Sequence, residues 1–188
     1  GELRSSGYLF NNRGHRSISE NISDAVNGWE QLRKGKEVNG AVARKIYSFM
    51  STKDRVARGF KKLTSVEDTD LLDLKALTAD HGLLATEDMV WHVAMDRMPE
   101  SERAYIIAML RRGERFNGEP RITVSTIHGA KGGEADNVVL FTDLSPASEE
   151  QMTINPDDMH RVFYVGVTRA KENLFIVEPE DFTRSYDL

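Results

Sequence analysis

The spacing of apolar residues changes its character along this chain. Gly7–Phe10 has the make-up of a short strand, and the polar residues 11–15 that follow predict a loop. From Ser19 to Gly113 apolar side chains recur three or four positions apart, which places them on one face of an α-helix. The first part of the chain is therefore expected to be mainly helical.

Beyond Gly118 the pattern is that of strand, loop and strand, followed by a helix. Residues 122–126 are rich in β-branched side chains, and Asn137–Phe141 is an apolar run that predicts a strand buried on both faces. A helix is expected over 157–170 and a last strand over 174–177. This alternation predicts an α/β fold in which crossover helices join the strands of a parallel sheet.

The helical region should contain several helices that end at glycines. The first should end at Gly35, and the last has Pro99 before it, Ser101 as its expected N-cap, Leu110 on its inner face and Gly113 at its end. The expected helices cover residues 19–34, 41–50, 71–77, 86–98 and 101–110.

Composition and charge narrow the class of protein. The chain has 188 residues and 39% hydrophobic content, which suits one domain or one domain with a large insertion. It has no cysteine, which excludes disulfides and thiolate metal sites and fits a reducing cytoplasm. No signal peptide or membrane-spanning run is present. A net charge of −5 argues against coating nucleic acid through bulk charge, so any DNA contact should be local.

The segment between the two predicted strands is the best candidate for a ligand loop. His128–Glu134 has the sequence HGAKGGE, with three glycines that let a backbone approach a ligand closely. Its histidine, lysine and glutamate supply three kinds of polar group. We expect a ligand-binding loop at the end of a parallel strand.

Two segments resemble conserved motifs of one helicase family. STIHGAKGGEADNVVL resembles the fifth motif of superfamily 1 DNA helicases of the UvrD/Rep type, and RVFYVGVTRAKENLFIV (Arg161–Val177) resembles their sixth. The combination of KGGE with a short insertion is similar to phage-like members. The resemblance implies that residues 1–18 and 118–188 form a RecA-like motor domain, called 2A, and that residues 19–117 form a helical insertion of the 2B type.

The resemblance also implies roles in ATP hydrolysis. Arg169 matches the arginine finger that stabilises charge on the γ-phosphate, although a plain arginine near a helix C-terminus is the simpler alternative. Glu134 matches the residue that bonds the ribose, or is a solvated loop acid, while Lys131 and Gly132 line the same nucleotide-binding loop. ATP and Mg²⁺ would also need the N-terminal RecA-like domain of the same protein, because no Walker A motif occurs in this chain.

Two further positions match residues that face single-stranded DNA. A Thr126 hydroxyl and a His128 imidazole can bond phosphates without reading sequence, although a lone histidine is more often structural. Tyr164 could reach nucleotide or DNA, but we expect it to pack its helix onto the sheet. The basic run 53–62 could touch phosphates, although a solvated helical face is expected. Asp143 is expected to be an ordinary strand end, and the histidines lack metal-ligand spacing.

The resemblance favours the C-terminal half of an ATP-dependent helicase that translocates 3′ to 5′ on single-stranded DNA in repair or replication. Two alternatives stay open. One is a RecD-like helicase of opposite polarity, whose loop more often reads H-K-x-x-G than HGAKG. The other is a non-catalytic DNA-binding or adaptor module that keeps the fold without the chemistry, against which the intact Arg169 and Glu134 speak.

Overall fold

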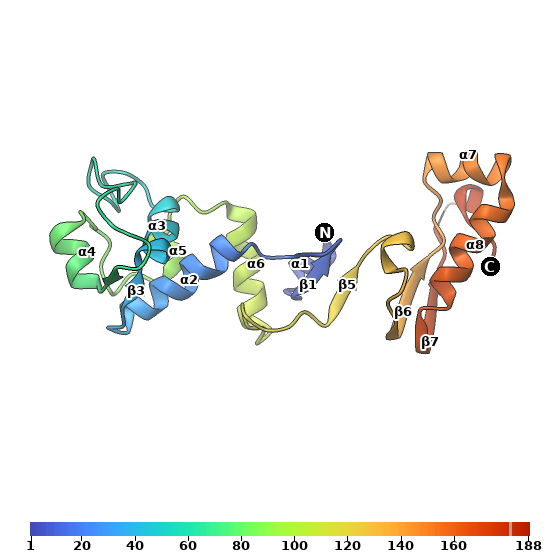
Figure 1. Ribbon diagram of the computed structural model, residues 1–188, viewed down its shortest axis with the longest axis horizontal. Coiled ribbons are helices and arrows are strands. Elements are labelled where there is room, and N and C mark those ends of the chain that lie inside the picture. Colours follow the sequence, from blue (N-terminus) through green and yellow to red (C-terminus); the bar gives the residue numbers. More distant parts are fainter. Residues whose placement is uncertain (181) are drawn as a thin grey trace. The chain divides into compact units, whose positions relative to one another are not determined.

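A computed structural model describes residues 1–180 and 182–188 (Figure 1). The chain divides into two compact units. Unit 1 comprises residues 1–11 and 15–122, and unit 2 comprises residues 12–14 and 123–188. In the described part of the chain, no helix is both long and apolar enough to cross a membrane.

Unit 1 holds the helices of the first part of the chain. They are α1 (Glu2–Ser5), α2 (Glu20–Arg33), α3 (Gly40–Ser48), α4 (Leu74–Asp80), α5 (Trp91–Ala94) and α6 (Glu100–Arg111). Short strands lie between them: β1 (Phe10–Asn12), β2 (His15–Arg16), β3 (Val38–Asn39), β4 (Leu71–Leu72) and β5 (Ile122–Val124), with β1 and β5 crossing the division between the units. The sheet orders are β2-β1-β5 and β3-β4.

Helix α2 is the centre of the core of unit 1. Ser19 caps it by accepting a hydrogen bond from the amide of Ile22, and its buried face includes Trp29. Gly28 lets α3 approach closely, because a Cβ there would lie 2.3 Å from a methyl group of Val42. The indole N–H of Trp29 donates to the carbonyl oxygen of Met89 at 2.9 Å, so the polar group of this buried side chain is hydrogen-bonded.

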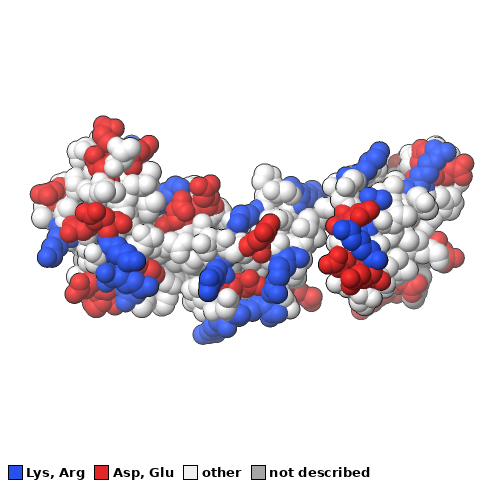
Figure 2. Space-filling view, turned by 60° about the horizontal axis from the view of Figure 1, so that its bottom comes forward, with Lys and Arg blue, Asp and Glu red and all other residues white. Residues whose placement is uncertain are grey.

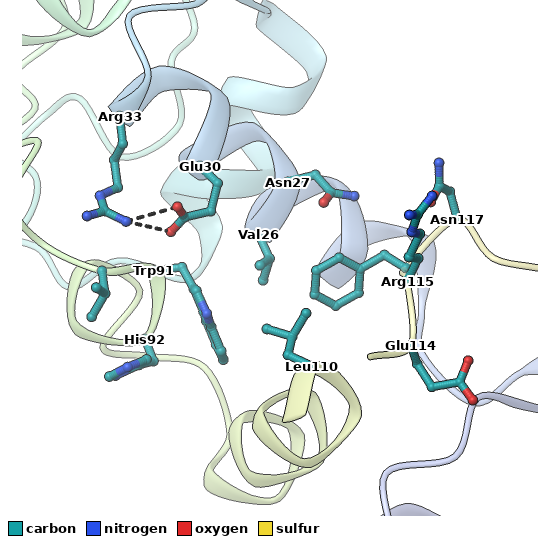
Figure 3. A pocket seen from close by; sticks show the side chains of 12 residues that line it. Val26, Asn27, Glu30, Arg33, Trp91, His92, Leu110, Glu114, Arg115 and Asn117 are labelled. Atoms are coloured by element: carbon teal, nitrogen blue, oxygen red, sulfur yellow. Dashed lines mark hydrogen bonds and ion pairs between the residues drawn. The ribbon is translucent and has the colours of Figure 1, made fainter. Parts of the chain in front are cut away.

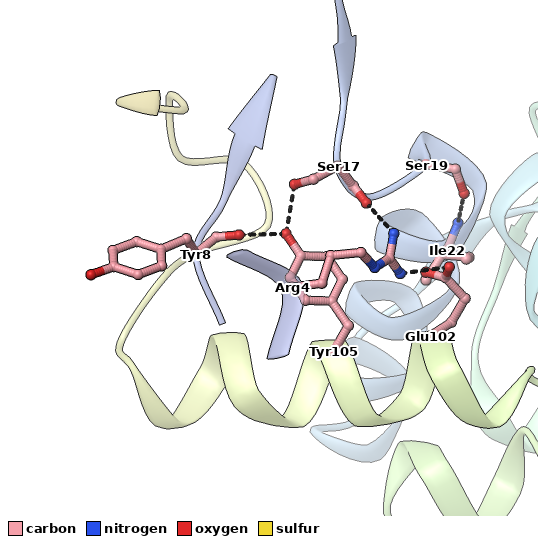
Figure 4. A network of polar contacts seen from close by, with 7 residues as sticks. All are labelled: Arg4, Tyr8, Ser17, Ser19, Ile22, Glu102 and Tyr105. Carbon is pink, nitrogen blue, oxygen red and sulfur yellow. Dashed lines mark hydrogen bonds and ion pairs between the residues drawn. The ribbon is translucent and has the colours of Figure 1, made fainter. Parts of the chain in front are cut away.

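A polar network fastens the start of the chain to α6 (Figure 4). The Tyr105 hydroxyl lies 2.6 Å from Ser17 Oγ and donates to the carbonyl oxygen of Tyr8 at 2.7 Å. The Arg4 guanidinium stacks on the Tyr105 ring and donates to Glu102 at 2.6 Å. Burial raises the pKa of Tyr105, so its hydroxyl stays protonated as a donor.

Three expectations about unit 1 were wrong. Residues 86–98 form a helix only over Trp91–Ala94, and the expected strand Gly7–Phe10 begins only at Phe10, because Gly7 adopts a positive φ of 72° against α6. Ser101 is not the N-cap of α6; Pro99 occupies that position.

Three further features of unit 1 differ from the sequence-based expectation. The helix expected over 71–77 begins only at Leu74, because Leu71 and Leu72 form β4 and pair with β3. Leu110 is 43% exposed rather than inward, because it lies at the edge of the buried stripe of α6. The basic run 53–62 is irregular rather than helical, and the ammonium of Lys61 donates to carbonyl oxygens that end α3, among them that of Ser48 at 3.1 Å. A lysine at a helix C-terminus is favoured there by the helix dipole.

Unit 2 is a parallel strand pair with a helix packed on one face. It contains η1 (His128–Ala130), β6 (Ala135–Phe141), α7 (Pro146–Ile154), α8 (Pro156–Val167), β7 (Ala170–Val177) and η2 (Phe182–Arg184). Helix α8 lies beside β6 and β7 (Figure 1) and buries Met159, Phe163 and Gly166. Tyr186 stacks on Phe163 with ring centroids 3.9 Å apart.

The expected double burial of Asn137–Phe141 was wrong within this chain. Leu140 is buried under α8, whereas Val139 and Phe141 on the opposite face are 56% and 60% exposed. Phe175, which pairs with Val139, is also 54% exposed on that face. Among the described residues of unit 2, only one side of the β6-β7 sheet is therefore covered.

Candidate functional site

The parallel pairing of β6 with β7 places the two helicase-like segments at one end of the strands. Ala135 pairs with Ala170 in the register, so Glu134 and Arg169 immediately precede partnered residues. Both segments therefore enter neighbouring strands at their amino ends. The loop does follow β5, as expected, but β5 pairs with β1 and belongs to another sheet, so the two predicted strands flanking the loop are not neighbours.

Helix α8 determines the position of Arg169, which follows the end of the helix. Pro156 starts the helix, and Asp157 and Asp158 in its first turn suit the positive end of the helix dipole. Near its end Gly166 packs against Leu140, where an added Cβ would lie 3.0 Å from a methyl carbon. This close approach brings the last turn of α8 onto the strand pair.

The Arg169 side chain folds back and joins the two segments. Its Nε donates to the carbonyl oxygen of Val165 at 2.9 Å, and its Nη2 donates to the Thr168 hydroxyl at 3.0 Å. Its Nη1 donates to the carbonyl oxygen of Gly133 at 3.1 Å, across to the glycine-rich loop. A guanidinium has five N–H donors, so two remain for another acceptor. The half-buried arginine thus binds the loop and still has two N–H groups that can donate to another acceptor.

The glycine-rich loop is open and polar around this arginine. Gly132 has a positive φ of 85°, a backbone conformation that residues with a side chain adopt only with strain. Lys131 beside it is exposed. The Glu134 carboxylate is exposed and lies 3.8 Å from the ammonium of Lys171, a distance that allows only a weak surface ion pair. The carboxylate is free to accept another donor.

The two predicted DNA-facing residues lie on one short turn. Thr126 and His128 are both exposed, and the Thr126 hydroxyl accepts a hydrogen bond from the amide of Gly129 at 3.1 Å. This bond holds the start of the loop and leaves the hydroxyl hydrogen free to donate. The turn therefore presents one hydroxyl donor and one imidazole to solvent.

We expected from the sequence that Tyr164 would pack α8 onto the strands, and this prediction was wrong. Its side chain is 70% exposed, and Phe163 makes the packing contact instead. Phe163 packs against Tyr186, and no pattern in the sequence indicates that partner. The amide of Tyr186 donates to the carbonyl oxygen of Thr142 at 2.9 Å, and its hydroxyl bonds His160, so this segment covers α8.

Charge on the molecular surface is mixed rather than concentrated. On the face shown in Figure 2, basic and acidic side chains are interspersed over most of the surface, and several basic side chains lie together at the lower edge of the central part of the view. Within the described residues, no group of three or more histidines, aspartates or glutamates could hold a metal ion. Cations near the candidate site are individual: Lys131, Arg169 and Lys171.

The comparison with known proteins agrees with the motifs. No curated protein and no solved structure matches the chain. The family model of the UvrD-like helicase C-terminal domain matches residues 15–180, which is most of the chain and includes every candidate site residue named above. The mixed α/β architecture of small sheets and helices is consistent with that family. The chain therefore belongs to the UvrD-like helicase C-terminal domain family.

Proposed function

We propose that this chain is the C-terminal motor half of an ATP-dependent DNA helicase that translocates 3′ to 5′ on single-stranded DNA. In this proposal residues 1–18 and 118–188 correspond to a RecA-like domain, and the helical residues 19–117 correspond to an insertion of the 2B type. ATP would bind between this chain and an N-terminal RecA-like domain of the same protein. Family membership supports the helicase assignment.

One observation carries the proposal: the bond between Arg169 and Gly133. It joins the segment that resembles motif VI to the loop that resembles motif V, although the two are distant in sequence. A nucleotide that engaged Arg169 would therefore also affect the loop that bears Thr126 and His128. Such a connection between nucleotide and DNA sites is what a translocating motor requires.

The nucleotide chemistry follows from the available groups. Arg169 would donate its two free N–H groups to the γ-phosphate and stabilise the charge that develops there during transfer. Glu134 would accept hydrogen bonds from the ribose hydroxyls, and Lys131 would lie near the phosphates. Mg²⁺ would neutralise phosphate charge when bound, and its protein ligands would belong to the N-terminal domain.

DNA binding would rest on few contacts. Thr126 can donate its hydroxyl hydrogen to a phosphate, and His128 can bond the backbone or lie against a base. Because the net charge is −5 and the basic residues are dispersed, we expect the affinity to fall only gently with salt, at a slope of about −0.7 per phosphate neutralised.

The test uses the parent protein that joins this chain to its N-terminal domain. Arg169→Ala should lower kcat by roughly 10³- to 10⁵-fold with a smaller change in ATP affinity. Arg184→Ala, an exposed arginine outside the two motif-like segments, is the matched control and should leave kcat unchanged. The 188-residue chain alone should hydrolyse no ATP. A loss below tenfold would assign Arg169 to a helix-terminus role, and a parent without DNA-stimulated hydrolysis would favour the adaptor alternative.

A second variant tests the DNA assignment. His128→Ala should reduce DNA-stimulated ATP hydrolysis more than basal hydrolysis, because it removes a DNA contact and leaves Arg169 and Glu134 in place. An equal loss in both rates would mean that His128 supports the loop. No loss in either rate would remove His128 from the site.

A further inference from the structure

Unit 1 contains an open pocket far along the sequence from the candidate motor site. The pocket has a volume of 560 Å³ and lies among α2, α5, α6 and the segment 114–117 (Figure 3). In that view the side chains of Val26, Trp91 and Leu110 point toward a common space. Its lining residues are Val26, Asn27, Glu30, Arg33, Val90, Trp91, His92, Leu110, Glu114, Arg115, Phe116 and Asn117.

The pocket has a buried apolar floor and an accessible apolar rim. Val26 and Trp91 are part of the buried core, whereas Val90 and Leu110 keep 37% and 43% of their surface exposed. Phe116 is half-buried beside them. Exposed apolar side chains that surround a hollow are typical of a surface that another molecule covers.

The charges around the floor are unequally compensated. Glu30 receives two hydrogen bonds of 2.9 Å from Nη1 of Arg33, and that pair closes one side of the pocket. Glu114 lies 3.7 Å from Arg121. Arg115 is exposed and makes no side-chain hydrogen bond or ion pair with the described residues. Figure 3 shows Arg115 across the pocket from Arg33, so the uncompensated charge on the rim is positive.

We propose that this pocket docks an amphipathic helix of a protein partner, with apolar side chains on the floor and a carboxylate paired with Arg115. The lining residues come from helices, a helix cap and an irregular segment, so no strand edge is offered to an extended peptide. Nucleic acid fits less well. Glu30 and Glu114 would repel phosphates, and the Trp91 side chain is only 6% exposed, which leaves little ring surface for a base to stack on.

Binding can be measured on the 188-residue chain with two designed peptides. One is a helical peptide with leucines at positions i, i+3, i+4 and i+7 and glutamates beside them, and the other has lysines in place of the glutamates. Trp91 lies in the pocket wall, so tryptophan fluorescence reports occupancy. The acidic peptide should bind at least about fivefold more tightly than the basic one, and added salt should reduce the difference.

Matched variants separate the apolar contacts from the charge on the rim. Leu110→Asp should weaken the acidic peptide at least about tenfold, whereas Leu84→Asp, at a residue that is 45% exposed outside the pocket, should not. Arg115→Glu should weaken it roughly three- to tenfold and reverse the preference between the peptides. Arg111→Glu on the exposed end of α6 is the control for charge alone.

Three results would overturn the proposal. The first is no fluorescence change with either peptide at about 1 mM, the weakest binding that would be specific here. The second is equal loss from each pocket variant and its control. The third is binding of single-stranded or duplex DNA that competes with the acidic peptide and depends on Arg115, which would assign the pocket to nucleic acid. None of these results depends on ATP hydrolysis.

Discussion

Replacing Arg169 by alanine should loosen the glycine-rich loop even without nucleotide. The substitution removes three hydrogen bonds, to the carbonyl oxygens of Val165 and Gly133 and to the Thr168 hydroxyl. It also removes a cation from the end of α8, where the helix dipole favours positive charge. The loop then keeps the contacts within its own segment, the weak pair between Glu134 and Lys171, and the backbone bond from Ala135 to the carbonyl oxygen of Arg169 at 3.0 Å.

The size of the effect follows from the exposure of the site. Each lost hydrogen bond is worth about 0.5–1.5 kcal/mol, and the charge at the helix end about 0.3–1 kcal/mol. Water can replace several of these partners because Arg169 is only half-buried. We therefore expect unit 2 to lose about 1–2 kcal/mol of unfolding free energy. Arg169→Lys should lose less, because it keeps the charge and one donor.

Hydrogen exchange of the amides of residues 133–135 is the direct measurement. Both tryptophans of the chain, Trp29 and Trp91, lie in unit 1, so fluorescence follows unit 1 and serves as an internal control. Exchange should accelerate roughly five- to thirtyfold in Arg169→Ala, which corresponds to the expected 1–2 kcal/mol. The fluorescence transition in urea should not move.

Arg161→Ala is the matched substitution. Arg161 lies on the same helix but forms only an exposed pair with Asp158 at 3.3 Å, worth about 0.3–0.5 kcal/mol. If both variants accelerated exchange equally, or if neither did, Arg169 would not hold the loop. The proposed link between the nucleotide and DNA sites would then lose its structural basis.

Three further variants test unit 1 through tryptophan fluorescence in urea. Tyr105→Phe should cost about 1–2 kcal/mol, because it leaves the carbonyl oxygen of Tyr8 without a partner and leaves Ser17 Oγ with only the amide of Phe10. Tyr8→Phe, whose hydroxyl bonds no described residue, should change stability by less than about 0.5 kcal/mol. Burial raises the pKa of Tyr47, so the unfolded chain loses this proton first, and stability should fall above a pH of about 10 by at most about 1.4 kcal/mol per pH unit. Tyr47→Phe should flatten that fall, and an unchanged slope would contradict it. Gly7→Ala should cost about 3 kcal/mol or more, because its Cβ would lie 2.4 Å from the carbonyl oxygen of Ala108. Gly113→Ala shares a positive φ but has open space and should cost about 1–2 kcal/mol.

Local signals in the sequence predicted the structure where the chain satisfies its own backbone. Helix α2 has a serine cap, a buried stripe and Gly35 with a positive φ of 71°, and its bounds were anticipated closely. The helix expected over 86–98 does not form along its whole length, because side chains distant in sequence donate hydrogen bonds to backbone carbonyl oxygens of this segment. Arg33 donates to Glu87 and Trp29 donates to Met89, which holds the backbone in an irregular path. No local sequence pattern predicts hydrogen bonds between residues so distant in the chain.

In the candidate site, too, some features could be predicted from the sequence and others could not. The identity of the loop and the order of the motifs are sequence properties, and the family comparison agrees with them. The retracted path of Arg169 depends on how the end of α8 meets the loop, which the sequence does not specify. The exposure of Tyr164 has a similar cause, because Phe163 fills the packing position and turns its neighbour on the helix outward.

The division of the chain also affects the order in which its parts can form during synthesis. The hairpin tip, residues 12–14, belongs to unit 2, and the amide of Arg13 donates to the carbonyl oxygen of Val124 at 2.9 Å. A ribosome makes Arg13 early and Val124 only after the whole helical region. The amide of Arg13 therefore lacks this partner while α2 to α6 are made, and it gains the bond only after β5 has been made. Unit 2 can be completed only after the helical region has been synthesised, and it cannot be excised as one continuous fragment.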